Sequence, residues 1–414
     1  MKTGSARFER ALPWLLGAWP IASLGAEAVG PGTGTAIFTI LGLHYAVAGI
    51  LIAGFFLSKL SRPVRAHRSK GLFMLLVLLL WALCVTLLNA QNLVVGIAKL
   101  GELSAFVILG IATASFSRGA GEEVFLKAFR ALAAGLIAAL ILSMAADVGF
   151  RDVFENRRVP GFVHIRILGF SATIAIAITT AWLVRAEEQQ QRWLPALLLC
   201  LGWTVLFWSA SRGGVLAFIA TFAILGAFLA PLRRNWGPWL AALVTGFGLS
   251  YLVPGLGDTG TQTMFDHDLT VDGLSTGRWT LWEQTLGFVA AQPLIGHGYG
   301  QFHTLAVSAG GLPETVMPHS HNVILESALA IGWPATAVLG GLVIWSWIKW
   351  ACNVRRDTSE AGLASLLVVS TLLIYALVDG VYFYPESALA FALAAGVLSA
   401  SSARHQLKRR MTRP

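Results

Sequence analysis

The chain has 414 residues, of which 56% are hydrophobic and only 12% charged, and its mean hydropathy is +0.69. A soluble globular protein carries roughly twice that charged fraction, so the composition excludes this class and indicates a polytopic membrane protein. The net charge of +9 and the tail RHQLKRRMTRP do not point to nucleic acid, because basic clusters in membrane proteins mark the cytoplasmic side. We therefore expect membrane lipids, and no nucleic acid, as partners.

Apolar runs along the chain predict an all-α, polytopic fold with about 12 transmembrane helices. A helix needs ~20 mostly apolar residues to cross the hydrocarbon core, and strands of a membrane barrel would not give continuous apolar runs of that length. The first run could also be read as a signal peptide, but its length suits an uncleaved span. The runs occupy about residues 11–28, 36–57, 71–88, 93–115, 127–147, 168–184, 194–209, 213–230, 237–253, 322–348, 362–383 and 386–401.

The same runs divide the chain into three parts. Residues 1–253 are predicted to form transmembrane helices 1 to 9, and residues 322–414 helices 10 to 12 with the basic tail. Residues 254–321 form the one long loop. Of the 30 basic residues, 23 lie at the termini or in alternate loops, six lie on the opposite side and Lys99 lies within a span. The positive-inside rule then places both termini in the cytoplasm and the long loop in the periplasm.

Six arginines are predicted on the side where basic residues are disfavoured. Three of them occur in the hydrophilic segment RDVFENRRVPGF, where solvation is the simpler reading. Arg212 differs, because SRGG is only a short break between two apolar runs, and an ionisable group there is a candidate for a functional site. Lys99 and Glu102 are three residues apart inside a span and are expected to pair with each other. The six arginines are Arg151, Arg157, Arg158, Arg166, Arg212 and Arg278.

The long loop begins with an acidic stretch that lacks the spacing of an EF-hand, so a solvated loop is expected there. The following STGRWTLWEQTLGFVAAQP predicts an interfacial helix, capped by Ser275 or Thr276 and ended by Pro293. Its apolar face would comprise Trp279, Trp282, Leu286 and Val289. Arg278 beside the helix N-terminus would bind a phosphate or reach lipid headgroups; this segment alone does not separate the two.

Two histidines precede the tenth span, in MPHSHNVILESALAIGWP. His319 and His321 would point to opposite sides of an extended segment, which disfavours a shared metal unless the chain turns. The alternative is that one imidazole serves as a general base at neutral pH, while arginines neutralise an anionic leaving group. Upstream, GHGYGQ lacks the strand and the spacing of a nucleotide-binding loop, so a tight turn is expected.

Three motifs in this order, SRGG, GRWTLWEQTLGFVAAQPLIGHGYGQF and HSHNVILESALAIGWP, resemble those of the O-antigen ligase family. The resemblance covers about residues 160–350 by motif and the whole chain by span count. In the family, a histidine followed by Asn, Ser or Gln precedes a glycine and a further small residue. His321, Asn322 and Gly332 match this signature, and Ala335 stands where glycine is usual.

The resemblance implies an inner-membrane glycosyltransferase with a periplasmic active site and no metal or other cofactor. Its donor would be O-antigen linked to undecaprenyl pyrophosphate, and its acceptor the lipid A-core of lipopolysaccharide. By the same resemblance His321 is the catalytic base, Arg212 and Arg278 bind pyrophosphate, and Arg166 is a further donor contact, with His319 and Asn322 in possible supporting roles. An O-antigen polymerase and a protein O-oligosaccharyltransferase use the same donor and stay open. A secondary transporter is disfavoured because no internal repeat is found.

Overall fold

The computed structural model describes residues 2–27, 34–60, 70–149, 162, 165–186, 189–254, 261–265, 277–311, 317–356 and 359–411. These residues form helices joined by turns, which confirms the all-α class. Each predicted span overlaps one long helix. The helices are α1 (Lys2–Glu27), α2 (Gly34–Leu60), α3 (Lys70–Asn89), α4 (Leu93–Ala120), α5 (Glu122–Gly149), α6 (Ile165–Arg185), α7 (Gln189–Trp208), α8 (Arg212–Phe228), α9 (Ala230–Arg234), α10 (Trp236–Ser250), η2 (Thr261–Met264), α12 (Arg278–Ala291), α13 (Phe302–Ser308), α14 (Val323–Arg356), α15 (Glu360–Tyr375), η3 (Val381–Phe383) and α16 (Pro385–Met411).

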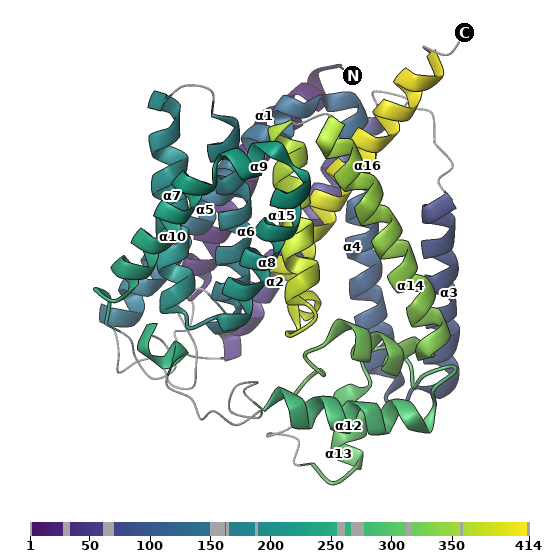
Figure 1. Ribbon diagram of the computed structural model, residues 1–414. Helices are drawn as coiled ribbons and strands as arrows, with labels where there is room; N and C mark the ends of the chain where they lie inside the picture. Colours follow the sequence, from purple (N-terminus) through teal and green to yellow (C-terminus); the bar gives the residue numbers. More distant parts are fainter. Residues whose placement is uncertain are drawn as a thin grey trace.

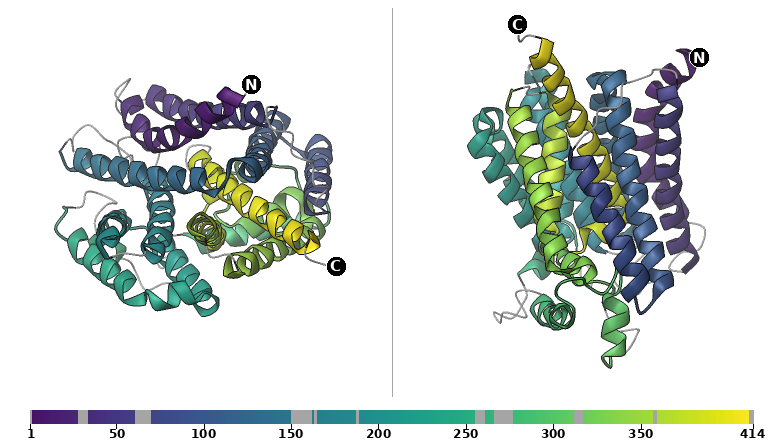
Figure 2. Two further views of the ribbon diagram at one scale, coloured as in Figure 1. Left: turned by 90° about the horizontal axis from the view of Figure 1, so that it is seen from above. Right: turned by 90° about the vertical axis from the view of Figure 1, so that its right-hand side faces the viewer.

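Within the described part of the chain, six helices are long and apolar enough to cross a membrane, and α8 and α15 are shorter apolar helices. The count of twelve spans stays a prediction. The long helices run side by side, and α12 lies across one end of the bundle with α13 beside it (Figures 1 and 2). The start of α1 and the end of α16 lie at the other end. We call these the α12 end and the terminal end.

The core of the bundle is built around α6 and α15. The apolar stretch of α6 is 94% buried, and almost every residue of α15 is buried. These helices pack against each other, and α6 also packs against α5 and α7. By contrast, only 22% of the apolar stretch of α3 is buried. An apolar helix with so little protein around it is stable only where lipid covers it, so α3 lies at the edge of the bundle.

The segment GHGYGQ forms the predicted tight turn between α12 and α13. Gly296, Gly298 and Gly300 have positive φ angles, which glycine adopts without steric cost. The backbone N–H groups of His297 and Gly298 donate to carbonyls of α14, at 2.7 and 3.1 Å. The turn therefore fixes α12 against α14.

Some predicted boundaries are wrong. The interfacial helix begins at Arg278 with Gly277 as its N-cap, in the left-handed conformation, instead of Ser275 or Thr276. The predicted apolar residues lie on one side of this helix at helical spacing, but only Val289 is buried, against α13 and α14, while Trp279 and Leu286 are about half exposed. The predicted span 362–383 is also too long, since α15 ends at Tyr375 and a loop follows.

Two groups of predicted residues lie outside the described residues. They are the arginines Arg151, Arg157 and Arg158, and the acidic residues Asp258, Asp266, Asp268 and Asp272 of the long loop.

Candidate active site

Several helices begin at the α12 end, and three of them have an arginine at their first or second residue. Arg212 and Arg278 are the first residues of α8 and α12, and Arg166 is the second residue of α6. The N-terminus of a helix carries a partial positive charge and unpaired N–H groups, so these arginines strengthen a field that already favours anions. The sequence predicted all three on this side, and the structure brings Arg166 and Arg278 to a single carboxylate.

That carboxylate belongs to Asp379, in the loop between α15 and η3. Its Oδ2 accepts a hydrogen bond from Nη2 of Arg278 at 2.9 Å, and its Oδ1 accepts from Nδ1 of His321 at 2.7 Å. Arg166 adds its Nη1 at 3.8 Å from Oδ1. The side chain of Asp379 is 3% exposed, so these contacts form in a poorly hydrated place, where charge-assisted hydrogen bonds are strong.

His321 is held in an unusual backbone conformation. Its φ angle is 53°, in the left-handed region, which costs a non-glycine residue about 1 to 3 kcal/mol and is found most often at functional sites. The imidazole is 3% exposed and donates through Nδ1 to Asp379, which leaves Nε2 as the acceptor nitrogen. Nη1 of Arg166 lies 3.0 Å from both ring nitrogens.

His319 lies next to His321, and the expectation that the two side chains diverge is wrong. Because the chain turns at His321, the ring centroids are 4.1 Å apart. Nδ1 of His319 accepts from the backbone N–H of His321 at 3.3 Å, and its ring stacks on Phe383. A Cβ at Gly380 would lie 1.8 Å from Cε1 of His319, so only glycine lets the loop of Asp379 pass this closely.

Asn322 connects the histidine loop to the loop of Asp379. Its Oδ1 accepts from the N–H groups of Ile324 and Leu325 at 2.9 and 3.1 Å, which satisfies the first turn of α14. Its Nδ2 donates to the carbonyl of Leu377 at 3.0 Å. Asn322 therefore has a structural role, because it holds both the first turn of α14 and the loop segment that leads to Asp379.

The charges in this cluster shift the pKa values of its members. Burial lowers the pKa of His321, and the charges of Arg166 and Arg278 add to this, while the hydrogen bond and charge of Asp379 act in the opposite direction. Burial also lowers the pKa of His319, well below its ordinary value. Burial alone would raise the pKa of Asp379, but His321, Arg278 and Arg166 outweigh it and lower the pKa of this carboxyl. The cluster therefore contains neutral imidazoles and an ionised carboxylate at neutral pH.

Arg212 lies close enough to Arg278 for their like charges to repel each other. The start of α8 is fixed by Ser211, whose hydroxyl is 2.5 Å from that of Tyr375 in α15. Arg166 and Arg278 contact Asp379, and Arg212 adds a third guanidinium group beside Arg278. Three arginines gathered in this way suit the binding of a multiply charged anion.

The predicted pair of Lys99 and Glu102 is confirmed, with Nζ of Lys99 2.9 Å from Oε2 of Glu102. The hydroxyl of Tyr45 also donates to Glu102. The charge of Lys99 reaches His319, so the pair lies near the histidine loop although it belongs to α4.

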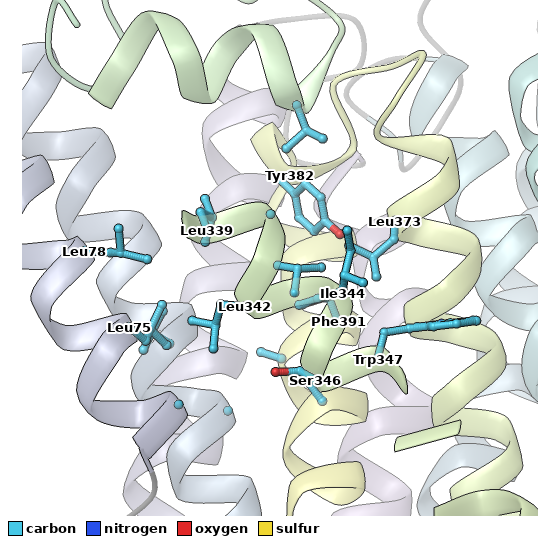
Figure 3. Close-up of a pocket in the computed structure, with 18 of the residues that line it drawn as sticks. Leu75, Leu78, Leu339, Leu342, Ile344, Ser346, Trp347, Leu373, Tyr382 and Phe391 are labelled. Carbon is cyan, nitrogen blue, oxygen red and sulfur yellow. The ribbon is translucent and has the colours of Figure 1, made fainter. Parts of the chain in front are cut away.

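A cavity of about 1310 Å³ extends from this region along the bundle. Leu75 and Leu78 of α3 line one side, and Leu373, Tyr382 and Phe391 line the other, with Leu339 and Leu342 of α14 between them (Figure 3). The wall is apolar along most of its length. At the α12 end it includes Leu377 and Phe383, the residues on either side of the loop that carries Asp379.

The sequence reasoning missed Asp379. One signal was available, because a single aspartate inside a predicted span, as in YALVDGVYF, is costly in a membrane and marks a candidate site. Glu326 was also missed; it is buried and accepts from the backbone N–H of Ser320 at 3.0 Å, which supports the histidine loop. Among the described residues, no group of three or more His, Cys, Asp or Glu side chains is arranged to hold a metal ion.

Comparison with known protein families gives one finding of direct relevance. The family model described as O-Antigen ligase matches residues 196–340. This stretch contains Arg212, Arg278, His319, His321 and Asn322, whereas Arg166 and Asp379 lie outside it. No curated protein matches the chain.

Proposed function

We propose that this protein is an O-antigen ligase, a glycosyltransferase of the family whose model matches residues 196–340. The donor would be O-antigen polysaccharide on undecaprenyl pyrophosphate, and the acceptor a sugar hydroxyl of the lipid A-core. The observation that carries this proposal is the buried pair of His321 and Asp379, surrounded by arginines at helix N-termini. A base beside an anion site is what transfer from a pyrophosphate requires.

In the proposed mechanism, Asp379 holds His321 with Nδ1 protonated, so that Nε2 accepts the proton of the acceptor hydroxyl. The hydroxyl oxygen forms a bond to the anomeric carbon, and the bond from that carbon to the pyrophosphate oxygen breaks. The pyrophosphate leaves as an anion and needs no proton, because Arg212 and Arg278 neutralise its charge. The protein's own cations thus perform the task that a divalent metal performs elsewhere.

Arg166 connects the proposed base with the proposed pyrophosphate site. Its Nη1 lies 3.0 Å from Nε2 of His321, the nitrogen that is proposed to accept the proton. Phosphate oxygens bound among the arginines would compete for this guanidinium, since an anion is a stronger acceptor than a neutral imidazole. Donor binding would then free Nε2 for the acceptor hydroxyl, and the base would become available only when the donor is in place.

The cavity offers a place for the donor's prenyl chain. Its α12 end lies beside the loop of Asp379, and its wall continues between α3, α14 and α16 toward the terminal end (Figure 3). A lipid whose chain enters here keeps its phosphates at the level of Arg166 and Arg278. The sugar would then lie above the bilayer, on the proposed periplasmic side, with both termini in the cytoplasm.

Reconstitution tests the proposed function directly. The purified protein in liposomes would receive undecaprenyl-pyrophosphate-linked glycan together with lipid A-core, and transfer would be followed by the mobility of the lipid A product. We expect transfer that persists in EDTA. Elongated donor in the absence of lipid A-core would identify an O-antigen polymerase, and modification of a serine or threonine in an added protein would identify a protein O-oligosaccharyltransferase. Either result would refute the ligase.

We expect Arg212→Ala and Arg278→Ala each to lower transfer roughly 10²- to 10³-fold, the usual cost of removing one group that stabilises developing charge. Lysine at either position should restore activity only in part, because it lacks the planar fork of the guanidinium. The measurement is kcat/KM in the reconstituted system. Arg234→Ala, in α9, is the matched control and should keep full activity. A fully active Arg212→Ala protein would show that Arg212 contacts lipid headgroups and does not bind the pyrophosphate.

The proposed chain site can be tested with two neighbouring glycines of α14. Gly340 lines the cavity, whereas Gly341 does not, and a Cβ at either position meets no atom within 4 Å. We expect Gly340→Trp to lower transfer from the undecaprenyl donor at least tenfold and to spare a donor with two or three isoprene units. Gly341→Trp should spare both donors. Equal effects of Gly340→Trp on long and short donors would contradict a chain site in this cavity.

A further inference from the structure

The cavity has a second charged end, remote from the candidate active site. Lys70 is the first residue of α3, Arg118 lies in the last turn of α4, and Lys349 lies near the end of α14, and all three line the cavity. These parts of the three helices lie at the terminal end of the bundle (Figures 1 and 2). Ser346 and Ser402 add hydroxyl groups to the same wall.

This end of the cavity has no compensating negative charge among the described lining residues. The only acid in that lining is Glu102, which is paired with Lys99 near the α12 end. The Nε atom of Arg118 is buried and has no hydrogen-bond partner within the described part of the chain. Basic residues that simply reach the aqueous phase would point away from the protein. Lys70 is exposed, but all three residues line the apolar cavity, and Arg118 and Lys349 are partly buried. Their arrangement is complementary to an anion that carries apolar chains.

We propose that this end of the cavity binds an anionic phospholipid, with the phosphate among Lys70, Arg118 and Lys349 and the acyl chains in the cavity. Basic pockets between transmembrane helices characteristically bind such headgroups. The ammonium group of Lys349 makes a cation–π contact with Trp345, another lining residue, with Nζ 5.1 Å from the ring centroid. With the orientation proposed above, the lipid comes from the cytoplasmic leaflet, but the binding does not depend on glycosyl transfer.

The length of the cavity leaves room for a chain from each leaflet. Its lining residues on α14 extend from Val323 to Trp350, which corresponds to about 40 Å of helix at ~1.5 Å per residue. The hydrocarbon core is ~30 Å thick, and the acyl chains of one leaflet fill about half of it. A phospholipid at the terminal end therefore leaves the part of the cavity beside Asp379 to the proposed donor, and the two lipids occupy opposite ends.

Native mass spectrometry of the full-length protein in detergent tests this proposal, with phosphatidylglycerol and phosphatidylcholine of identical acyl chains as probes. Wild type should retain phosphatidylglycerol in clear preference to phosphatidylcholine. In the variant with Lys70→Gln, Arg118→Gln and Lys349→Gln, this preference should fall roughly tenfold or more, because each basic residue near the headgroup contributes. The matched control is Arg355→Gln with Arg356→Gln, two exposed arginines of α14 that do not line the cavity.

Three outcomes decide the matter. Loss of the preference in the cavity variant alone supports the proposal. Equal loss in the control would mean that the overall positive charge of the terminal end holds the lipid. An unchanged preference in the cavity variant would mean that Lys70, Arg118 and Lys349 do not bind the headgroup. Either result would overturn the proposal. Thermal unfolding of every variant, measured in parallel, shows whether a lost lipid reflects a lost site or a lost fold. An inactive wild type in the glycan assay would refute the ligase and leave this result intact.

Discussion

Replacement of His321 by glutamine is expected to lower the rate of glycan transfer roughly 10²- to 10⁴-fold, the usual contribution of a positioned general base. Glutamine keeps a polar side chain of similar reach but cannot accept a proton at neutral pH. Donor binding should largely persist, because it is assigned to the arginines. The kinetic signature is therefore a low kcat with a donor KM close to that of wild type.

The pH dependence of kcat/KM in the wild-type protein also tests the role of His321 as the base. The proposed mechanism needs neutral His321, and burial together with Arg166 and Arg278 lowers the pKa of this imidazole below its ordinary value near ~6.5. The neutral form therefore persists to lower pH, and activity should fall only as the pH drops below about 6.5. An acid limb of kcat/KM centred well above that value would contradict the assignment of the base.

His319→Gln is the control for His321→Gln. His319 lies beside the base, where its Nδ1 accepts the backbone N–H of His321, and a glutamine carbonyl can accept the same bond. Loss of one such bond costs about 1 kcal/mol, so the rate should change by about tenfold at most. A dead His319→Gln protein with an active His321→Gln protein would show that the wrong imidazole was chosen. Activity in both variants would refute the general-base mechanism.

Much of the fold could be predicted because a membrane span has a simple physical signature. Each apolar run in the sequence overlaps a helix, since a backbone in lipid must satisfy its own hydrogen bonds. The ends of the helices were harder to predict. Gly277 caps α12 through a left-handed conformation, and propensity favoured the side-chain caps Ser275 and Thr276 over a glycine.

The candidate site could be predicted only where a residue violated a rule that the sequence reveals. Arg166, Arg212 and Arg278 stood out because the positive-inside rule disfavours them. Asp379 does not stand out in this way, because the apolar residues on both sides of it predict one continuous span over residues 362–383. Its partners are 58 residues away at His321 and 101 residues away at Arg278, so only the folded chain brings them together. The backbone turn at His321 likewise depends on contacts that no local pattern reports.

Asp379→Asn is the second variant for which a large effect is expected, with a fall in kcat of roughly 10²- to 10⁴-fold. Asp379 accepts from Nδ1 of His321 and so keeps Nε2 free of a proton. Asparagine can instead donate its amide N–H to Nδ1, which stabilises the tautomer with the proton on Nε2, and that tautomer cannot accept the proton of the acceptor hydroxyl. The side chain remains nearly the same size, so the loss should not come from packing.

The pH profile of Asp379→Asn separates this role from a purely structural one. The carboxylate raises the pKa of His321 through its hydrogen bond and its charge, so asparagine should lower that pKa further, and the acid limb of the residual activity should move to lower pH. Glu386→Gln is the matched control, because Glu386 is another buried carboxylate that pairs with a histidine. Its Oε1 lies 2.5 Å from Nε2 of His44, and the pair does not include His321. We expect this control to keep both the rate and the position of the limb. If Asp379→Asn lowered the rate but left the acid limb where it is in wild type, Asp379 would be a structural ion-pair partner of Arg278 and no part of the base.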